Sequence, residues 1–295
     1  MKSLKIILIF TSVFAYSQSN IFDRLSVLDN NGKTWYNIDG YSVTSEVFNN
    51  SFDEKGLKKI FKKHNITETD LKIRDEKIDF NNYFITKKQN IAGNIFQTNN
   101  YYFVENPNNT TTTVVWFIKN GITDRETEEE LVNKIINNQI PRENFVQLQI
   151  QSIDFVGRKI ELGNSCYWTY LNTVQCPYFG EMNWSIHKTL EDAKQSIENQ
   201  FNITKTRKNI KIASENIVDV EFEGVPTKAK KVIVEFTGVT SALAGMSGGK
   251  SLTVYYIAEN VRNKNISCVM SFWNNDLINP DTKLPPLLEK VMNVK

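Results

Sequence analysis

Strand-forming runs alternate with capped helices along this chain, and that alternation restricts the folds open to it. The runs are rich in β-branched and aromatic residues and are separated by Asn, Gly and Pro, which favours antiparallel neighbours. Three helices each begin at a Ser or Thr with an acidic residue three positions later, and a fourth follows a Pro-Pro pair. These helices are predicted over residues 53–64, 123–138, 189–204 and 285–292. The sequence therefore predicts an α+β fold of mostly antiparallel strands with about four short helices.

The first predicted strands form a hairpin, because Asn31-Gly32 tolerates the positive φ angles of a tight turn. In the first half of the chain, the predicted strands are residues 25–28, 33–36, 71–80, 83–87, 94–97, 101–105 and 111–119. In the second half they are residues 145–153, 155–162, 166–171, 183–187, 209–213, 217–223, 231–237, 252–259 and 266–273.

The two halves follow a similar order of hairpin, capped helix, meander and helix. The first helix of each half even ends in the same triplet, Asn-Ile-Thr, at residues 65–67 and 202–204. The spacing between corresponding elements is uneven, so two arrangements stay open: a tandem pair of similar α+β domains, or one large α+β domain. For the tandem pair we place the boundary near Pro141, which gives an N-terminal domain of residues 18–141 and a C-terminal domain of residues 142–295.

Residues 1–17 have the pattern of a signal peptide. Lys2 and Lys5 precede an apolar run, and Ala15-Tyr16-Ser17 has the small-x-small form that signal peptidase cleaves. The run is about half of the roughly 20 residues that a membrane-spanning helix needs, and no later run is longer. We therefore expect export, cleavage near Ser17, and a soluble mature protein that is secreted or periplasmic and has no membrane span. The abundance of Asn, Lys and Ile is typical of an AT-rich bacterial genome.

Charge and motifs exclude several function classes. The chain has 35 basic and 33 acidic residues, and loss of Lys2 and Lys5 leaves it balanced, without the basic face of a nucleic-acid-binding protein. Residues 244–251 end in Gly-Lys-Ser like a phosphate loop, but Ala244 occupies the first glycine position and a strand-like run follows. His and Cys also lack the spacings of a zinc site. We expect no nucleic-acid partner, no cofactor and no metal.

The three cysteines are Cys166, Cys176 and Cys268, and an exported protein generally meets oxidising conditions. Sequence proximity favours a disulfide between Cys166 and Cys176. A tight turn at residues 171–174 would not place these two cysteines directly opposite each other, so the bond requires a bulge or a longer loop. A pairing with Cys268 and a fully reduced chain stay open.

Catalytic candidates are weak. A nucleophilic cysteine needs a nearby base, and Cys176 with His187 is the pair that the composition permits. No family signature surrounds Cys176, and His187 has a simpler interpretation as a structural residue. A pair of carboxylates for hydrolysis is the other candidate, but nothing selects two of the 33 acidic residues.

Aromatic residues are dense between positions 167 and 184. Four of them are candidate ligand-binding residues: Trp168, Tyr170, Tyr178 and Trp184. Packing in the core is the competing interpretation, because aromatic side chains dominate core energetics. Exposed, coplanar rings would favour a binding platform, whereas interdigitated rings would favour the core.

Three function classes remain. The preferred one is a non-catalytic exported binding or interaction module, whose partner is an unknown protein, a glycan or a small apolar ligand. The second is a secreted hydrolase with a carboxylate or Cys/His site. The third is an envelope-assembly or structural protein.

Overall fold

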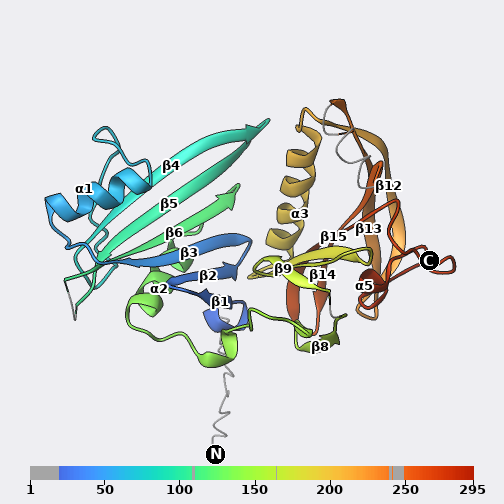
Figure 1. The fold of residues 1–295 in the computed structure, drawn as a ribbon, viewed down its shortest axis with the longest axis horizontal. Coiled ribbons are helices and arrows are strands. Elements are labelled where there is room, and N and C mark those ends of the chain that lie inside the picture. Colours follow the sequence, from blue (N-terminus) through green and yellow to red (C-terminus); the bar gives the residue numbers. More distant parts are fainter. Residues whose placement is uncertain (1–19, 108–109, 164, 239–240, 242–248) are drawn as a thin grey trace, which may run out of the picture.

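The computed structural model describes residues 20–107, 110–163, 165–238, 241 and 249–295 (Figure 1). The predicted signal peptide, with its cleavage point near Ser17, and most of the Gly-Lys-Ser loop lie outside these residues. Within them, all strand pairs are antiparallel and form sheets of six, eight and two strands, accompanied by the α-helices α1, α2, α3 and α5. The predicted α+β class is confirmed.

The six-stranded sheet has the order β1-β2-β3-β6-β5-β4 and carries a helix on each face (Figure 1). Helix α1 packs Leu57 and Ile60 on the face of Tyr101 and Phe103, while α2 packs Leu131 on the opposite face. The elements are β1 Ser26–Asn30, β2 Lys33–Ile38, β3 Tyr41–Phe48, α1 Glu54–Lys63, β4 Asn82–Ala92, β5 Ile95–Glu105, β6 Thr112–Asn120 and α2 Arg125–Ile136, with a short 3-10 helix at Ile21–Asp23. We call this unit the N-terminal lobe.

The eight-stranded sheet has the order β16-β12-β13-β14-β15-β11-β10-β9. Helix α3 covers the face turned towards the N-terminal lobe, and the β7–β8 hairpin and α5 cover the other face (Figure 1). The elements are a 3-10 helix at Arg142–Asn144, β7 Ser152–Phe155, β8 Arg158–Glu161, β9 Tyr167–Tyr170, β10 Thr173–Cys176, β11 Gly180–His187, α3 Leu190–Lys205, β12 Ile210–Phe222, β13 Val225–Phe236, β14 Ser251–Val261, β15 Lys264–Trp273, α5 Pro286–Glu289 and β16 Met292–Val294. We call this unit the C-terminal lobe.

The two large sheets are wound in the same way. Each begins with a three-stranded meander, continues through a helix, and returns in a second meander whose last strand pairs with the third strand of the first. These closing pairs are β3 with β6 and β11 with β15. The C-terminal sheet has additional strands beyond this common order. This common winding matches the similar order of elements in the two halves of the sequence, while a tandem pair of domains divided at residue 141 stays a prediction.

Local sequence signals placed the long helices well. The caps predicted at Ser51 and Thr123 were two residues and one residue too early, because α1 is capped by Asp53 and α2 by Asp124, whereas Thr189 caps α3 as predicted. Each cap acts through a side-chain oxygen that accepts a backbone N–H. The predicted C-terminal helix was too long, because α5 ends at Glu289 and residues 292–294 form strand β16.

Two predicted strands are wrong. Residues 71–80 form a loop with a single bridge from Ile73 to Phe84, because the side chain of Asn82 binds both the N–H and the carbonyl of Asp75. Residues 145–151 are also irregular, and the nearby strand β7 begins only at Ser152. Conversely, the predicted strands divided β5 and β12 into two each and omitted β3 and β10.

The preferred disulfide is confirmed, since Cys166 and Cys176 are bonded. Tyr170 pairs with Thr173, but the register then shifts so that Tyr167 lies opposite Gln175. One residue further along, that register brings the two cysteines opposite each other. The bulge that the sequence required is therefore present, and Cys268 is a buried free cysteine on β15.

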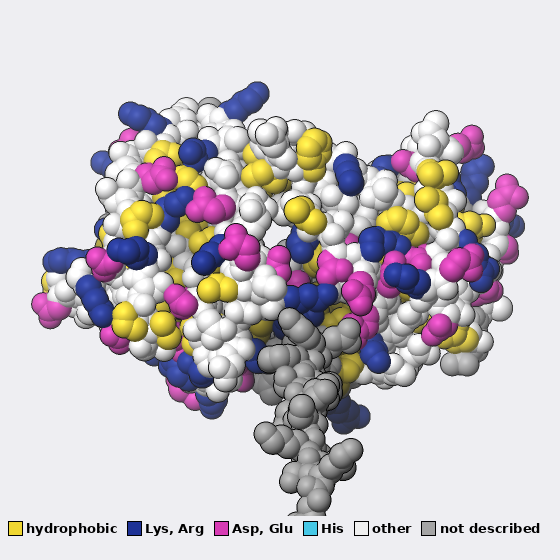
Figure 2. Space-filling view, turned by 180° about the vertical axis from the view of Figure 1, so that it is seen from behind, with side chains coloured by type: hydrophobic (Ala, Val, Ile, Leu, Met, Phe, Trp, Pro, Cys, Tyr) yellow, Lys and Arg dark blue, Asp and Glu magenta, His cyan; other side chains and the backbone are white. Residues whose placement is uncertain are grey.

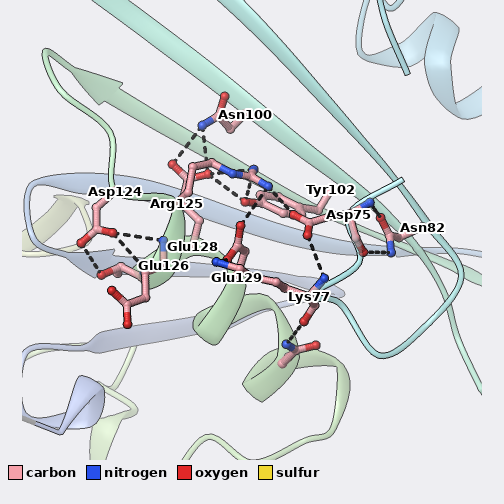
Figure 3. A network of polar contacts seen from close by, with 12 residues as sticks. Asp75, Lys77, Asn82, Asn100, Tyr102, Asp124, Arg125, Glu126, Glu128 and Glu129 are labelled. Atoms are coloured by element: carbon pink, nitrogen blue, oxygen red, sulfur yellow. Dashed lines mark hydrogen bonds and ion pairs between the residues drawn. The ribbon is translucent and has the colours of Figure 1, made fainter. Parts of the chain in front are cut away.

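A buried polar network fixes α2 to the sheet (Figure 3). Glu128 has no exposed surface, and it accepts hydrogen bonds of 2.9 Å from Tyr41, Tyr102 and Asn100. Arg125, one turn earlier on α2, donates to the Tyr102 hydroxyl and lies 3.6 Å from the ring centroid of Phe84. Three donors from the sheet thus converge on one helix carboxylate.

We predict that Glu128→Gln destabilises the protein by about 2–4 kcal/mol, because the new amide N–H₂ must face hydrogen-bond donors inside the core. Glu130→Gln is the matched control, since Glu130 is exposed on the same helix, and its effect should stay within about 0.5 kcal/mol. Urea unfolding followed by circular dichroism measures both. Equal midpoints for the two variants would contradict the anchoring role of Glu128.

Candidate functional site

A cleft of about 370 Å³ lies between the two lobes, and we call it the interlobe cleft. The N-terminal lobe contributes the β2–β3 turn and the loop from β6 to α2, and the C-terminal lobe contributes β11 and the first half of α3. In the space-filling view, the surface is open between the lobes, and acidic and basic side chains lie side by side around the opening (Figure 2). Amide and hydroxyl side chains supply most of the remaining lining.

Backbone contacts bring the lobes together at the turn Asp39-Gly40. The N–H of Asp39 donates to the carbonyl of Ile186 at 3.0 Å, and the N–H of Gly40 donates to the hydroxyl of Ser185 at 2.9 Å. Gly40 has a φ of +75°, and a Cβ there would lie 3.1 Å from Cε1 of His187. This close approach therefore requires a residue without a side chain.

A second glycine, Gly121, allows a further contact between the lobes, at the end of β6. Gly121 has a φ of +103°, and a Cβ there would lie 2.7 Å from the side-chain amide nitrogen of Asn199 on α3. That amide donates to the carbonyl of Asn120 at 3.1 Å. The end of β6 is thus held against α3, which forms one wall of the cleft.

Two ion pairs lie at the cleft. Arg24 binds both carboxylate oxygens of Asp39, at 2.9 and 3.2 Å, and both side chains are buried. Burial raises the pKa of Asp39 even though Arg24 acts in the opposite direction. Across the lobes, Lys188 contacts Asp124 at 2.6 Å. Burial opposes ionisation of Asp124, but hydrogen bonds from Lys188 and Thr127 outweigh it and lower its pKa to about 2.

Lys119 is a half-buried cation on β6. Its ammonium lies 4.3 Å from the ring centroid of Tyr41, a cation–π contact. Within the described part of the chain, it has no carboxylate within 4 Å and no hydrogen-bond acceptor. Burial lowers the pKa of Lys119, and the charges of Asp39 and Asp192 oppose that effect. The three N–H donors of Lys119 are therefore open to a ligand.

His187 lies at the end of β11 and is 2% exposed. Its Nε2 lies 2.8 Å from the hydroxyl of Ser267, while its buried Nδ1 has no hydrogen-bond partner among the described residues. Burial and the nearby charge of Lys119 lower the pKa of His187 to about 4. The imidazole is therefore neutral at neutral pH, with one unsatisfied nitrogen at the wall of the cleft.

The structure contradicts the pairing of Cys176 with His187. Cys176 is in the disulfide, so it carries no thiol, and it lies opposite Gly180 at the other end of β11. Seven residue-to-residue steps of extended strand lead from Gly180 to His187, a distance of about 23 Å. The partner of His187 is Ser267, but that hydroxyl is in the middle of β15 in a residue 2% exposed.

The four aromatic candidates are not brought together. Tyr170 is 38% exposed and lines the interlobe cleft. Trp168 and Trp184 line a separate cavity of about 580 Å³ beneath the segment that joins the lobes, with ring centroids 6.0 Å apart and planes tilted by 43°. Trp184 is 3% exposed and packs edge-on against Phe155, so it belongs to the core. Tyr178 is 62% exposed and lines neither cavity.

Sequence reasoning missed the polar residues of the cleft. Asp39-Gly40 is a turn dipeptide between two strand-like runs, which is a readable hairpin signal. Lys119 gives no such signal, because a lysine near the end of a strand is ordinarily a solvated residue. Only the packing of the C-terminal lobe against β6 makes Lys119 part of a site.

Comparison with known proteins gives no functional lead. No protein family and no curated protein matches the chain. One solved structure, DynU16 from the dynemicin biosynthetic locus, aligns with 87% of this chain and 77% of its own length at 8% identity. Its TM-score of 0.18 supports no argument about fold or function. Among the described residues, no helix is long and apolar enough to cross a bilayer, and no three His, Cys, Asp or Glu side chains are grouped as metal ligands would be.

We predict that His187 makes stability depend on pH. Its pKa is about 4 in the folded protein and roughly 6.5 in the unfolded chain, so the unfolded chain binds more protons between these values. The free energy of unfolding should therefore fall as the pH drops from roughly 6.5 to 4, with His187 contributing up to about 3 kcal/mol.

The test compares wild type with His187→Gln, whose amide can still reach Ser267 but does not titrate. Between pH 7 and pH 4.5, wild type should lose about 2 kcal/mol more than the variant in urea unfolding. Proton NMR of the wild type should place the midpoint of the His187 ring near pH 4. Parallel stability curves together with a midpoint near pH 6.5 would contradict the buried, neutral state.

Proposed function

We propose that the chain is an exported, non-catalytic binding protein whose ligand occupies the interlobe cleft, and that this ligand is polyhydroxylated, as a glycan fragment is. The observation that carries this proposal is the lining of the cleft by amide and hydroxyl side chains from both lobes. Each of these groups both donates and accepts hydrogen bonds, as a sugar hydroxyl does. The volume of the cleft falls within the range of small-molecule sites.

His187 and Tyr170 support the same ligand class. A hydroxyl can donate or accept, so a ligand hydroxyl that reached the buried Nδ1 of His187 would satisfy it in either tautomer of the ring. Tyr170 supplies a partly exposed aromatic ring at the same cleft, against which the apolar face of a sugar can pack.

The charges of the cleft favour binding over hydrolysis. A glycosidase uses two carboxyl groups that face the substrate, one as acid and one as nucleophile or base. Here Asp39 is held by Arg24 and Asp124 is held by Lys188, which leaves Asp192 as the acidic residue of the lining without a cation within 4 Å in the described part of the chain. The Ser267–His187 contact has the distance of a nucleophile and its base, but the hydroxyl is buried away from the cleft.

We predict that Tyr170→Ala weakens binding of an oligosaccharide about tenfold, because the variant removes an aromatic contact and a hydroxyl from the cleft. Tyr178→Ala is the matched control, since it removes an equally large exposed ring that lines neither cavity. The wild-type protein is first screened on an array of neutral and acidic oligosaccharides, and calorimetry then measures the best binder.

Failure of every oligosaccharide to bind wild type more tightly than about 1 mM would overturn the glycan proposal. If a sugar binds but both tyrosine variants behave alike, the site lies outside the interlobe cleft. Tyr170→Phe distinguishes loss of the ring from loss of the hydroxyl, because it keeps only the ring.

A further inference from the structure

We infer that the ligand of the interlobe cleft carries a carboxylate that binds Lys119, so that the preferred glycan is an acidic one built from uronic acids. This inference rests on the proposed function and names the substrate class of the same site. The observations behind it are the charge balance of the cleft and the positions of its unsatisfied polar atoms.

The charges that face the cleft come from both lobes. The acidic ones are Asp39, Asp124 and Asp192, and the basic ones are Lys119 and Lys188, with Arg24 directly behind Asp39. Arg24 neutralises Asp39, and Lys188 neutralises Asp124 across the lobes. Within the described residues, one cation and one anion therefore remain without an ion-pair partner, namely Lys119 and Asp192.

These two remaining charges are not equivalent. Asp192 is exposed, it accepts a hydrogen bond of 2.7 Å from the hydroxyl of Thr189, and it lies in the first turn of α3, where the helix dipole favours a negative charge. Water and the dipole of α3 thus stabilise the negative charge of Asp192. Lys119 is half-buried against the ring of Tyr41, and it feels the charges of Asp39 and Asp192 only without a direct contact, so its N–H donors have no acceptor among the described residues. Placing an anionic oxygen beside Lys119 therefore gains more than placing a cation beside Asp192.

His187 gives a second, independent observation at the same end of the cleft. It lies close enough to Lys119 for the ammonium to lower its pKa, and its Nδ1 is buried without a partner in the described structure. When the Ser267 hydroxyl donates to Nε2, the ring proton is on Nδ1 and becomes a donor. Lys119 and His187, which both line the cleft, then both carry donors for a group with several acceptor oxygens.

A carboxylate suits the part of the cleft at Lys119 and His187 better than a phosphate does. Phosphate sites usually join several cations or the forked donors of arginine, whereas here the guanidinium of Arg24 is already committed to Asp39. One lysine without a contacting carboxylate matches one negative charge. Together with the hydroxyl-binding lining, this favours a sugar acid over a sugar phosphate.

The experiment uses matched sugars and the full mature chain. Oligomers of galacturonate, glucuronate and mannuronate are titrated by calorimetry at pH 7, each beside its methyl ester, which keeps the ring hydroxyls and removes the charge. We expect each acid that binds to do so about tenfold more tightly than its ester, because a hydrogen bond to a charged group is lost in the ester. Raising the salt concentration should weaken binding of the acid and leave the ester unchanged.

Three variants locate the charge. Lys119→Gln should remove the preference for the acid while the ester binds as before, and Lys119→Arg should keep the preference. Asp192→Asn should tighten binding of the acid about threefold, since it removes an exposed like charge. Circular dichroism and urea unfolding check that each variant folds.

The outcomes separate the two proposals. If the esters bind as tightly as the acids, or if Lys119→Gln leaves their ratio unchanged, the carboxylate inference is overturned while sugar binding in the cleft stands. If neither acids nor esters bind, and the neutral sugars of the array do not bind either, the proposed function fails as well.

Discussion

The contact between the turn Asp39-Gly40 and the end of β11 is the constraint on which the rest of the site depends. At this point the backbone of one lobe donates hydrogen bonds to the other, and the absence of a side chain at residue 40 lets the turn rest against His187. A larger residue would have to adopt a positive φ and displace the imidazole. The depth of the interlobe cleft and the burial of His187 both follow from this approach.

Hydrogen bonds link the core of the N-terminal lobe to the wall of the cleft. Glu128 accepts from the hydroxyl of Tyr41, and the same hydroxyl accepts from the N–H of Asp124, the residue that caps α2. The carboxylate of Asp124 in turn binds Lys188 on the other lobe. The position of α2, fixed by the network of Figure 3, therefore also positions an ion pair across the cleft.

The sequence predicted those parts of the fold that local chemistry decides. Asn31-Gly32 forms the predicted turn between β1 and β2, and Thr189 forms the predicted N-cap of α3. Residues 71–80 were assigned to a strand because β-branched and aromatic residues recur in them, yet Leu71 is 73% exposed. The side chain of Asn82, not a neighbouring strand, holds that segment in a loop. No local pattern reports such a contact.

The site was harder to predict than the fold because its residues meet only through tertiary structure. Gly40 and Ser185 are 145 residues apart, and the turn signal at Asp39-Gly40 does not indicate that Ser185 is its partner. The aromatic cluster gave a strong local signal, but its rings were distributed between the interlobe cleft, the second cavity and the open surface. The density of aromatic residues along the chain therefore indicated the burial of Trp184, but it did not indicate that these residues share one site.

The ligand preference of the cleft depends on which of its charged side chains already form ion pairs within the protein. Counting residues alone gives a nearly neutral site, with acidic and basic side chains in similar number. The pairs Arg24–Asp39 and Lys188–Asp124 are satisfied within the protein, so they hold the walls in place and leave little attraction for a ligand. What a ligand meets is the remainder: a half-buried ammonium, an imidazole with one free nitrogen, and a surface of amides and hydroxyls. That remainder, rather than the total composition of the cleft, is what favours an oxygen-rich ligand with one negative charge.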